Sequence, residues 1–226
     1  MLCLKNICKN FKQGDQEIRV LKKLNLNLKE NNLVGLIGPS GSGKTTLLNI
    51  IGLLDNYSTG ILEINNVNIG KLDLDQKNNF RKKSIGFIFQ NNQLLEDFSC
   101  EENIAFPLIL NGTSYKKAII ESNNLLQEFN LDHRSKFKPS LLSGGEQQRV
   151  SVLRSLIKKP KILLVDEPTG SLDNENSILV MNYIKKLSRK HKTLTIIATH
   201  NLSLVSMLDN CFEISEGKLV EYHRKK

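Results

Sequence analysis

Residues 38–45 combine three glycines, a lysine and a threonine at a spacing that can hold phosphate. The segment reads Gly-Pro-Ser-Gly-Ser-Gly-Lys-Thr, follows the apolar, strand-like stretch Leu33–Ile37 and precedes the helix-like stretch Thr46–Leu54. Glycines let successive backbone N–H groups face one anion, and the helix N-terminus adds its positive end. Lys44 would reach the β- and γ-phosphates, and Thr45 would hold Mg²⁺. The segment predicts a P-loop that binds ATP or GTP, and this context disfavours the alternative of a flexible Gly/Ser turn.

Two adjacent carboxylates, Asp166 and Glu167, follow the apolar run Ile162–Val165. A run that is apolar throughout fits a strand covered on both faces, and open α/β sheets bind ligands at the carboxyl ends of such strands. Asp166 would complete the Mg²⁺ shell, while Glu167 would polarise an attacking water. The alternative is a solvated pair of acids, but a P-loop that holds a Mg²⁺–triphosphate needs such a partner strand. Hydrolysis of a nucleoside triphosphate is therefore the favoured chemistry.

A second helix start with exposed backbone donors is predicted at residues 143–146, which read Ser-Gly-Gly-Glu. Ser143 and Glu146 have the spacing of a capping box, and the two glycines leave backbone N–H groups accessible to an anion. On its own, this segment would be interpreted as an ordinary capped helix.

Taken together, these segments resemble the motif set of the ABC ATPases, in the same order and over essentially the whole chain. The remaining members of the set are Gln90 after the strand-like Ile85–Phe89, Ser171-Leu172-Asp173, and His200 after the strand-like Leu194–Thr199. The resemblance implies an ATPase that works as a head-to-tail homodimer with two ATP molecules between the subunits. Each ATP would be held by the P-loop of one subunit and the Ser143–Gly145 segment of the other.

The resemblance also assigns roles to single residues. Gln90 would link the Mg²⁺ site to a membrane subunit, Asp173 would contact the other ATPase subunit, and His200 would hold the γ-phosphate and the catalytic water. The expected catalytic residues are Glu167, His200 and Gln90, and the expected Mg²⁺ ligands are Thr45, Gln90 and Asp166. The expected ATP-binding residues are Phe11, as the aromatic residue that stacks on adenine, Gly38, Pro39, Ser40, Gly41, Ser42, Gly43, Lys44, Thr45, Thr46, Ser143, Gly144, Gly145, Glu146 and Asp173.

The stretch after Gln90 resembles the ATPase of the bacterial lipoprotein-releasing system. The chain has the Leu-Leu-x-Asp-Phe core of that family at Leu94–Phe98, and Leu131–Arg134 agrees as well. Asn92 and Gln93 stand where that family usually has histidines. The ATPases of macrolide-type efflux and cell-division complexes are the alternatives within the same subgroup.

This resemblance implies a peripheral protein at the cytoplasmic face of the inner membrane. ATP hydrolysis would drive integral membrane transporter subunits to release outer-membrane-directed lipoproteins to a periplasmic carrier. The ATPase itself would contact neither the lipoprotein cargo nor nucleic acid. A soluble ABC ATPase acting on nucleic acid or ribosomes is less favoured, because the chain has neither a long coiled-coil insertion nor a second ATPase domain.

The elements that must position these residues alternate between strand-like and helix-like segments, which favours a largely parallel α/β sheet. Stretches around Leu4–Phe11 and Leu24–Leu28 predict an antiparallel layer, whereas helical patterns such as Tyr115–Phe129 and Ser143–Ile157 dominate residues 94–159. The predicted fold is an α/β, P-loop NTPase (RecA-like) core with an N-terminal antiparallel β layer and a helical subdomain. We expect one ABC ATPase domain over 1–226, with the core at 1–90 and 160–226 and the helical subdomain at about 91–159.

Composition bears on the cellular location of such a domain and on whether it needs a metal site or disulfides. The chain has 226 residues and a formal net charge of +9, and its basic residues are spread along the sequence. No apolar run approaches the roughly 20 residues of a membrane-spanning helix. The N-terminal residues lack the pattern of a secretory signal, and the four cysteines form no Cys-x-x-Cys pair. A cytoplasmic protein without a zinc site or a disulfide framework is expected.

Overall fold

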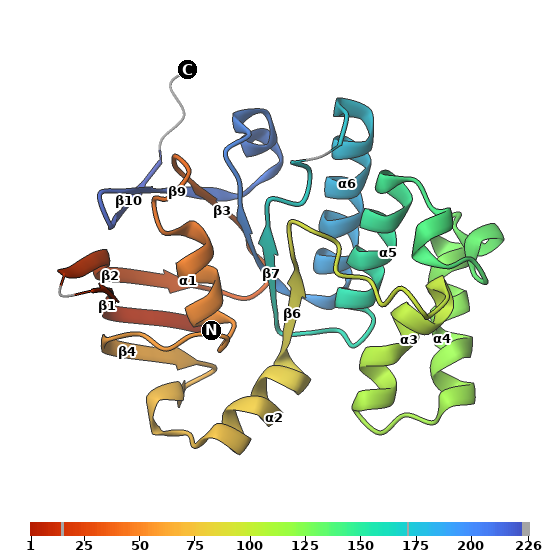
Figure 1. The fold of residues 1–226 in the computed structure, drawn as a ribbon, viewed down its shortest axis with the longest axis horizontal. Coiled ribbons are helices and arrows are strands. Elements are labelled where there is room, and N and C mark those ends of the chain that lie inside the picture. The colour runs from red at the N-terminus through yellow and green to blue at the C-terminus, as the bar shows by residue number, and fades with distance from the viewer. Residues whose placement is uncertain (15, 171, 223–226) are drawn as a thin grey trace.

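A mostly parallel sheet of six strands forms the centre of the computed structural model, which describes residues 1–14, 16–170 and 172–222 (Figure 1). The strand order is β10-β9-β3-β8-β7-β6; only the β10–β9 pair is antiparallel. Their bounds are β3 Leu33–Ile37, β6 Ile85–Ile88, β7 Ile162–Asp166, β8 Leu194–Ala198, β9 Asn210–Ser215 and β10 Lys218–Glu221. The predicted strands of the core are confirmed to within two residues at each end.

A second, antiparallel sheet contains the N-terminal strands, in the order β2-β1-β4-β5. Its strands are β1 Leu2–Gln13, β2 Gln16–Leu28, β4 Thr59–Ile64 and β5 Val67–Asn68. The predicted antiparallel layer is thus confirmed, but both long strands extend further than their alternating patterns indicate. Their pairing is interrupted by bulges, and Asn6 and Lys23 have positive φ angles of 51° and 53°. A bulge breaks the period-2 pattern, so the sequence shows only the regular part of each strand.

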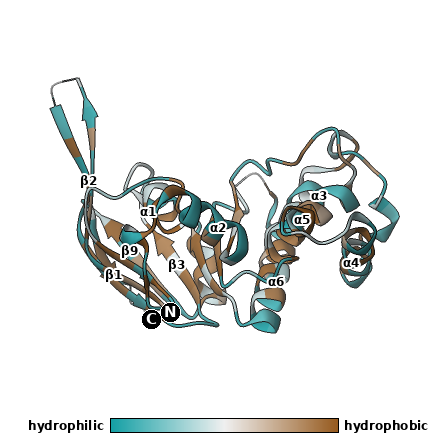
Figure 2. Ribbon diagram, turned by 90° about the horizontal axis from the view of Figure 1, so that it is seen from below, coloured by the Kyte–Doolittle hydropathy of each residue, from teal (hydrophilic) through white to brown (hydrophobic). Residues whose placement is uncertain are grey.

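The central sheet separates two hydrophobic cores. Successive residues of a strand face opposite sides. Leu164 packs with helix α1 (Lys44–Ile51) and the antiparallel sheet, whereas Leu163 and Val165 pack with the helices on the other face. Hydrophobic strands fill the interior between these layers in Figure 2. Burial on both faces explains why β3, β7 and β8 are apolar at nearly every position.

The helices on this second face are α5 (Gly144–Leu156) and α6 (Asn174–His191), with α3 (Cys100–Leu110) and α4 (Tyr115–Glu128) beyond them. Figure 1 shows α3 and α4 at the opposite end of the molecule from β1, β2 and β4. The helices predicted at Tyr115–Phe129 and Ser143–Ile157 are confirmed.

The remaining elements are α2 and short 3-10 turns. Helix α2 spans Leu74–Ser84, and the turns span Ile69–Lys71, Asp132–Arg134, Pro139–Leu141 and Leu202–Met207. Within the described part of the chain, every helix is too short or too polar to cross a lipid bilayer.

Candidate functional site

The glycine-rich loop 38–45 joins strand β3 to helix α1, as its sequence predicts. Gly38 has φ 147°, and a Cβ atom there would lie 2.6 Å from the carbonyl oxygen of Ile214 in β9. Gly43 precedes α1 with φ 105°, and a Cβ atom there would lie 2.8 Å from the side chain of Leu21. A positive φ and contacts this close exclude larger residues. Both glycines are therefore required for the loop to keep this shape.

The side chain of Lys44 folds back onto the beginning of the loop. Its side chain is buried, and its ammonium donates hydrogen bonds to the carbonyl oxygens of Gly38 at 2.8 Å and Pro39 at 3.0 Å. The Ser42 hydroxyl is also buried and has no hydrogen-bond partner among the described residues. A buried, unsatisfied hydroxyl next to a buried ammonium fits a ligand with several oxygen atoms.

Thr45 and Asp166 meet at the start of α1 and the carboxyl end of β7. The Thr45 hydroxyl donates to Asp166 Oδ2 at 2.8 Å. Asp166 is only 8% exposed, and this burial raises the pKa of its carboxyl, with the Thr45 hydrogen bond acting in the opposite direction. A desolvated carboxylate beside a hydroxyl oxygen offers the hard oxygen ligands that Mg²⁺ prefers. Both side chains therefore fit the predicted Mg²⁺ site.

Glu167 and His200 form a second pair at the same edge of the sheet. His200 Nδ1 lies 2.9 Å from Glu167 Oε1, and the Glu167 backbone N–H donates to the Ala198 carbonyl of β8 at 2.9 Å. Glu167 has φ 45°, an unusual angle for a residue with a side chain. Such strained residues concentrate at functional sites. The side chain of Glu167 is mostly buried, whereas that of His200 is exposed.

Gln90 follows β6, which pairs with β7. Its exposed side chain lies near the turn after Glu167: a Cβ atom added to Gly170 would be 3.9 Å from Gln90 Nε2. Gln90 therefore lies beside the turn that follows the two carboxylates, although no hydrogen bond between described residues joins it to them. Ser171, the next residue of this turn and part of the predicted motif set, lies outside the described residues.

The predicted capping box at the start of α5 is confirmed. The Ser143 hydroxyl accepts from the Glu146 N–H at 3.3 Å, and Glu146 accepts from the Ser143 N–H at 2.8 Å. Arg134 Nε donates to Glu146 at 2.8 Å. Burial opposes ionisation of Glu146, but these hydrogen bonds outweigh it and lower the pKa of the carboxyl. Glu146 is thus engaged within its own chain, while a Cβ atom on Gly144 would meet no atom within 4 Å.

Asp173 caps the start of α6 and holds Asn176, a residue that the sequence analysis did not select. Asp173 accepts from the backbone N–H and the side-chain amide of Asn176 at 2.8 and 2.7 Å, and these hydrogen bonds lower the pKa of its carboxyl. A Cβ atom on Gly145 would lie 2.9 Å from Asn176 Oδ1, and Arg149 donates to that oxygen at 3.4 Å. Asn176 therefore connects the starts of α5 and α6. The sequence signal for this contact is that Asn176 stands three residues after the helix-capping Asp173.

Phe11 lies on β1 and is 41% exposed, and the Lys9 ammonium lies 4.6 Å from the centroid of its ring. Its partner on β2 is Ile18, three residues before the Leu21 side chain that packs on Gly43. The remaining predicted phosphate-binding positions lie in the loop or the first turn of α1: Pro39, Ser40 and Gly41 are exposed, and Thr46 is half-buried.

The structure thus brings the predicted residues together as two groups. One group lies at the carboxyl ends of β3, β6, β7 and β8 and contains Lys44, Thr45, Asp166, Glu167 and His200. The other lies at the starts of α5 and α6 and contains the segments around Ser143 and Asp173. No hydrogen bond or ion pair of the described residues joins the two groups.

The family model for "ABC transporter" matches residues 21–170, so that it includes the loop, the carboxylates and the start of α5. The chain belongs to the ABC transporter family.

Curated relatives narrow this assignment. The chain is 40% identical over 219 residues to the lipoprotein-releasing system ATP-binding protein LolD of Pseudoalteromonas translucida, covering 97% of this chain and 94% of that protein. It is 42% identical to LolD of Rickettsia bellii, covering 97% of each chain, and 41% identical to LolD of Wigglesworthia glossinidia brevipalpis, covering 97% and 96%.

A solved structure agrees with these relatives. The dimeric ATP-binding cassette MJ0796 in a post-hydrolysis state, bound to ADP and Pi, superposes with a TM-score of 0.91 at 35% identity and 100% coverage of both chains. The predicted ABC ATPase fold is confirmed by this likeness.

Proposed function

We propose that this chain is the ATP-hydrolysing subunit of an ABC transporter that releases lipoproteins from a membrane. The relatives named LolD support the lipoprotein-releasing system, since their identity of about 40% extends over nearly the full chain. The contact between Glu167 and His200, beside Thr45 and Asp166, carries the proposal of hydrolysis.

ATP is bound through its phosphates by the loop 38–45. The backbone N–H groups of the loop and of the first turn of α1 surround the phosphates, and the Lys44 ammonium exchanges its two carbonyl partners for phosphate oxygens. Phe11 stacks on the adenine. Thr45, Asp166 and Gln90 would hold Mg²⁺, which would neutralise charge on the phosphates.

Hydrolysis is assigned to Glu167 and His200. Glu167 accepts the proton of the attacking water, because its mostly buried carboxylate lies next to the Mg²⁺ ligand Asp166 at the end of β7. His200 orients this carboxylate through the 2.9 Å contact. The exposed face of the imidazole is available to the γ-phosphate. The strained backbone of Glu167 serves to aim its side chain toward this position.

The second group of residues acts on the ATP that is bound by another copy of the chain. The Ser143 and Glu146 side chains cap α5, and the open surface at Gly144 lets a γ-phosphate from the other subunit approach the backbone donors. Asp173 holds the adjoining helix start at this interface. The dimeric cassette MJ0796 supports this homodimer.

Integral membrane subunits dock on the helical subdomain, for which we retain the bounds of about 91–159, with the core at 1–90 and 160–226. A groove of about 330 Å³ there is lined by Phe89, Leu95, Phe106 and other residues. Phe98 is 38% exposed, and its ring centroid lies 5.8 Å from that of Phe106. Apolar, partly exposed side chains beside Gln90 are suited to receive a segment of a membrane protein.

In this arrangement the ATPase is peripheral to the cytoplasmic face of the inner membrane and does not contact the lipoprotein cargo. The first test is purification of the tagged protein from its native membranes in mild detergent. We expect a membrane partner whose depletion retains lipoproteins in the inner membrane. A partner of a drug-efflux or cell-division complex, or recovery with DNA or ribosomes alone, would contradict the proposed function.

The docking groove is tested in the same preparation. Leu95→Asp and Phe98→Asp should abolish recovery of the membrane partner, because each places a charge in an apolar contact, while ATP binding persists. Ile120→Asp is the matched control, since Ile120 is exposed on α4 outside the groove. Normal complex assembly by both Leu95→Asp, in the groove, and Phe98→Asp, beside it, would refute this docking surface.

A further inference from the structure

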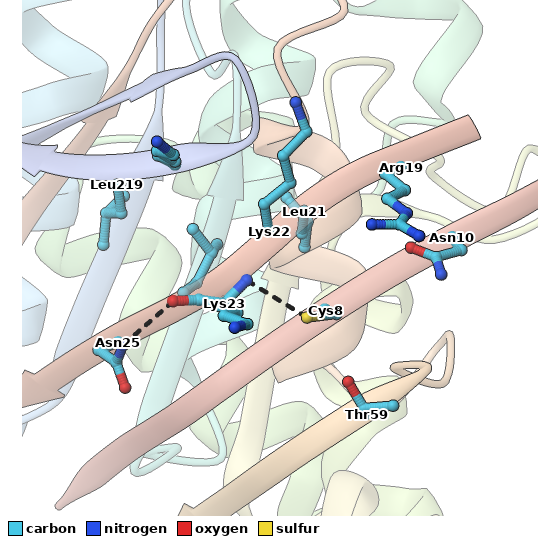
Figure 3. A pocket seen from close by; sticks show the side chains of 11 residues that line it. Cys8, Asn10, Arg19, Leu21, Lys22, Lys23, Asn25, Thr59 and Leu219 are labelled. Carbon is cyan, nitrogen blue, oxygen red and sulfur yellow. Dashed lines mark hydrogen bonds between the residues drawn. The ribbon is translucent and has the colours of Figure 1, made fainter. Parts of the chain in front are cut away.

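A cavity of about 800 Å³ opens on the outer face of the antiparallel sheet, beside the β9–β10 hairpin. Its residues come from β1, β2, β4 and β10, and they include none of the residues assigned to ATP, Mg²⁺ or the membrane partner. Figure 3 shows Cys8 between Lys23 on β2 and Thr59 on β4, with Arg19 further along β2. Its size is in the range of sites that hold a small organic molecule.

Irregular strand pairing creates this cavity. Between Ile7 and Lys9 the register of β1 with β2 shifts, and Lys23 has φ 53°. The Lys23 backbone N–H donates to Cys8 Sγ at 3.3 Å, as Figure 3 shows. Lys22 and Lys23 are consecutive, yet both line the cavity. A bulge re-aims side chains in this way, whereas a regular strand would send them to opposite faces.

Four cations surround the cavity: Arg19, Lys22, Lys23 and Lys218. All four are exposed, and no ion pair between described residues involves any of them. No acidic residue is among those that line the cavity. Uncompensated positive charge in a hollow concentrates the electrostatic field and attracts anions.

The remaining wall is partly apolar. Leu21 and Leu24 are buried beneath the cavity, and Leu219 lies at its side. Hydrogen bonding by the Thr59 side chain and the Lys23 backbone lowers the pKa of the Cys8 thiol, and the charges of Lys23 and Arg19 lower it further. An anion with several charges on a small organic frame matches these surroundings.

We infer that this outer-face cavity binds a small anion with three or more negative charges, such as a polyphosphate or a tricarboxylate. Arg19 and Lys23 supply the main charge contacts from β2, and Lys218 closes the site from β10. The site lies behind the P-loop, because the Leu21 side chain that lines the cavity also approaches Gly43. It is nevertheless independent of ATP chemistry, since it shares no charged group with the P-loop.

Cys8 provides a local reporter for this site. The measurement is the rate of alkylation of Cys8 by iodoacetamide, followed by mass spectrometry of tryptic peptides. Cys3, also half-buried on β1 but outside the cavity, is the internal control, and the two cysteines fall in different tryptic peptides because Lys5 lies between them. The probes are tripolyphosphate and citrate, each compared with sodium chloride at the same ionic strength.

The expected result is saturable protection of Cys8, but not of Cys3, by at least one probe. Which probe protects distinguishes phosphates from carboxylates. Arg19→Gln and Lys23→Gln should each raise the concentration for half-protection by about two- to fivefold, the effect expected from removing one exposed charge. Protection is expressed relative to the unliganded rate of each variant, because these cations also affect the thiol.

Two further variants distinguish binding in the cavity from a general effect of charge and from binding at the P-loop. Lys29→Gln removes an exposed lysine just after β2 that lies outside the cavity, so half-protection should not change. Lys44→Ala weakens the P-loop, and protection should persist if the anion binds at the outer face. Equal effects of chloride and the probes, equal protection of Cys3, or loss of protection in Lys44→Ala would each overturn the site.

Discussion

The phosphate-binding loop and the start of α5 both offer backbone donors to an anion, yet they differ in where their side chains find partners. Thr45 contacts Asp166, which is 121 residues away in the sequence, and the next residue, Glu167, contacts His200. At the start of α5, Ser143 and Glu146 bond to each other across three residues. The first group thus forms a site within one chain, whereas the second is a capped helix with an open surface.

This difference supports a homodimer in which one copy of the chain binds and hydrolyses an ATP molecule that the α5 start of the other copy contacts. In the proposed function, the phosphates, Mg²⁺ and the attacking water would be bound by groups that one chain already holds together. The start of α5 has no hydrogen bond or ion pair to those groups in the described residues, and in the proposed homodimer it would contribute when a second chain presents its own ATP. Variants in the first group should therefore impair ATP binding or hydrolysis within one subunit, and variants in the second should impair association of the two subunits.

The largest effect is expected in the first group. Glu167→Gln should lower ATP turnover by about 10²- to 10⁴-fold, which is the rate factor that a general base contributes, while ATP binding persists. Turnover is measured by phosphate release and binding by equilibrium dialysis. Glu30→Gln, at an exposed turn, is the control and should be fully active. Near-normal turnover in Glu167→Gln would remove this residue from the role of base.

A smaller effect is expected at the start of α5. Gly144→Ala should fold normally, since a Cβ atom there meets nothing within 4 Å. Its free energy of unfolding should rise by at most about 1 kcal/mol. Turnover should nevertheless fall by about 10- to 10²-fold, because the methyl group displaces the other subunit's ATP. Gly145→Ala, by contrast, should lose stability as well as turnover, because its Cβ approaches Asn176. Full activity of Gly144→Ala would contradict the division between subunits.

The smallest effect concerns the stability of the nucleotide-free protein. Burial raises the pKa of Asp166, so its ionised form opposes folding above the native pKa, and this penalty declines as the pH falls from the native pKa to the lower pKa of the unfolded chain. Asp166→Asn should therefore raise the melting temperature at pH 7, and the difference should narrow toward acidic pH. It should also weaken binding of Mg²⁺–ATP. Thermal melts from pH 7 down to about pH 4, near the ordinary pKa of an aspartate, provide the test, and a lower melting temperature at pH 7 would contradict the assigned cause.

The sequence predicted the central strands and the loop well, because burial on both faces and the required glycines leave a local pattern. It underestimated β1 and β2, where bulges at Asn6 and Lys23 interrupt the alternation. It also could not predict the hydrogen bond between Thr45 and Asp166, since that contact depends on the order of strands in the sheet.

The role of Asn176 and the outer-face cavity were also not predicted. Asn176 connects two helix starts that lie far apart in the sequence, and the cavity gathers residues from four strands. Both arise from the tertiary arrangement, for which neither composition nor periodicity carries a signal. The motif set indicated the candidate residues, and the structure shows which of them are in contact.

The division of the ATP site between two copies is tested most directly by sedimentation of purified Glu167→Gln, which should retain ATP without hydrolysing it. We expect a monomer without nucleotide and a dimer with ATP. Gly144→Ala, added to the same chain, should weaken the dimer while ATP binding is retained. A monomer in saturating ATP, or a dimer that is unaffected by Gly144→Ala, would show that the ATP site is not divided in this way.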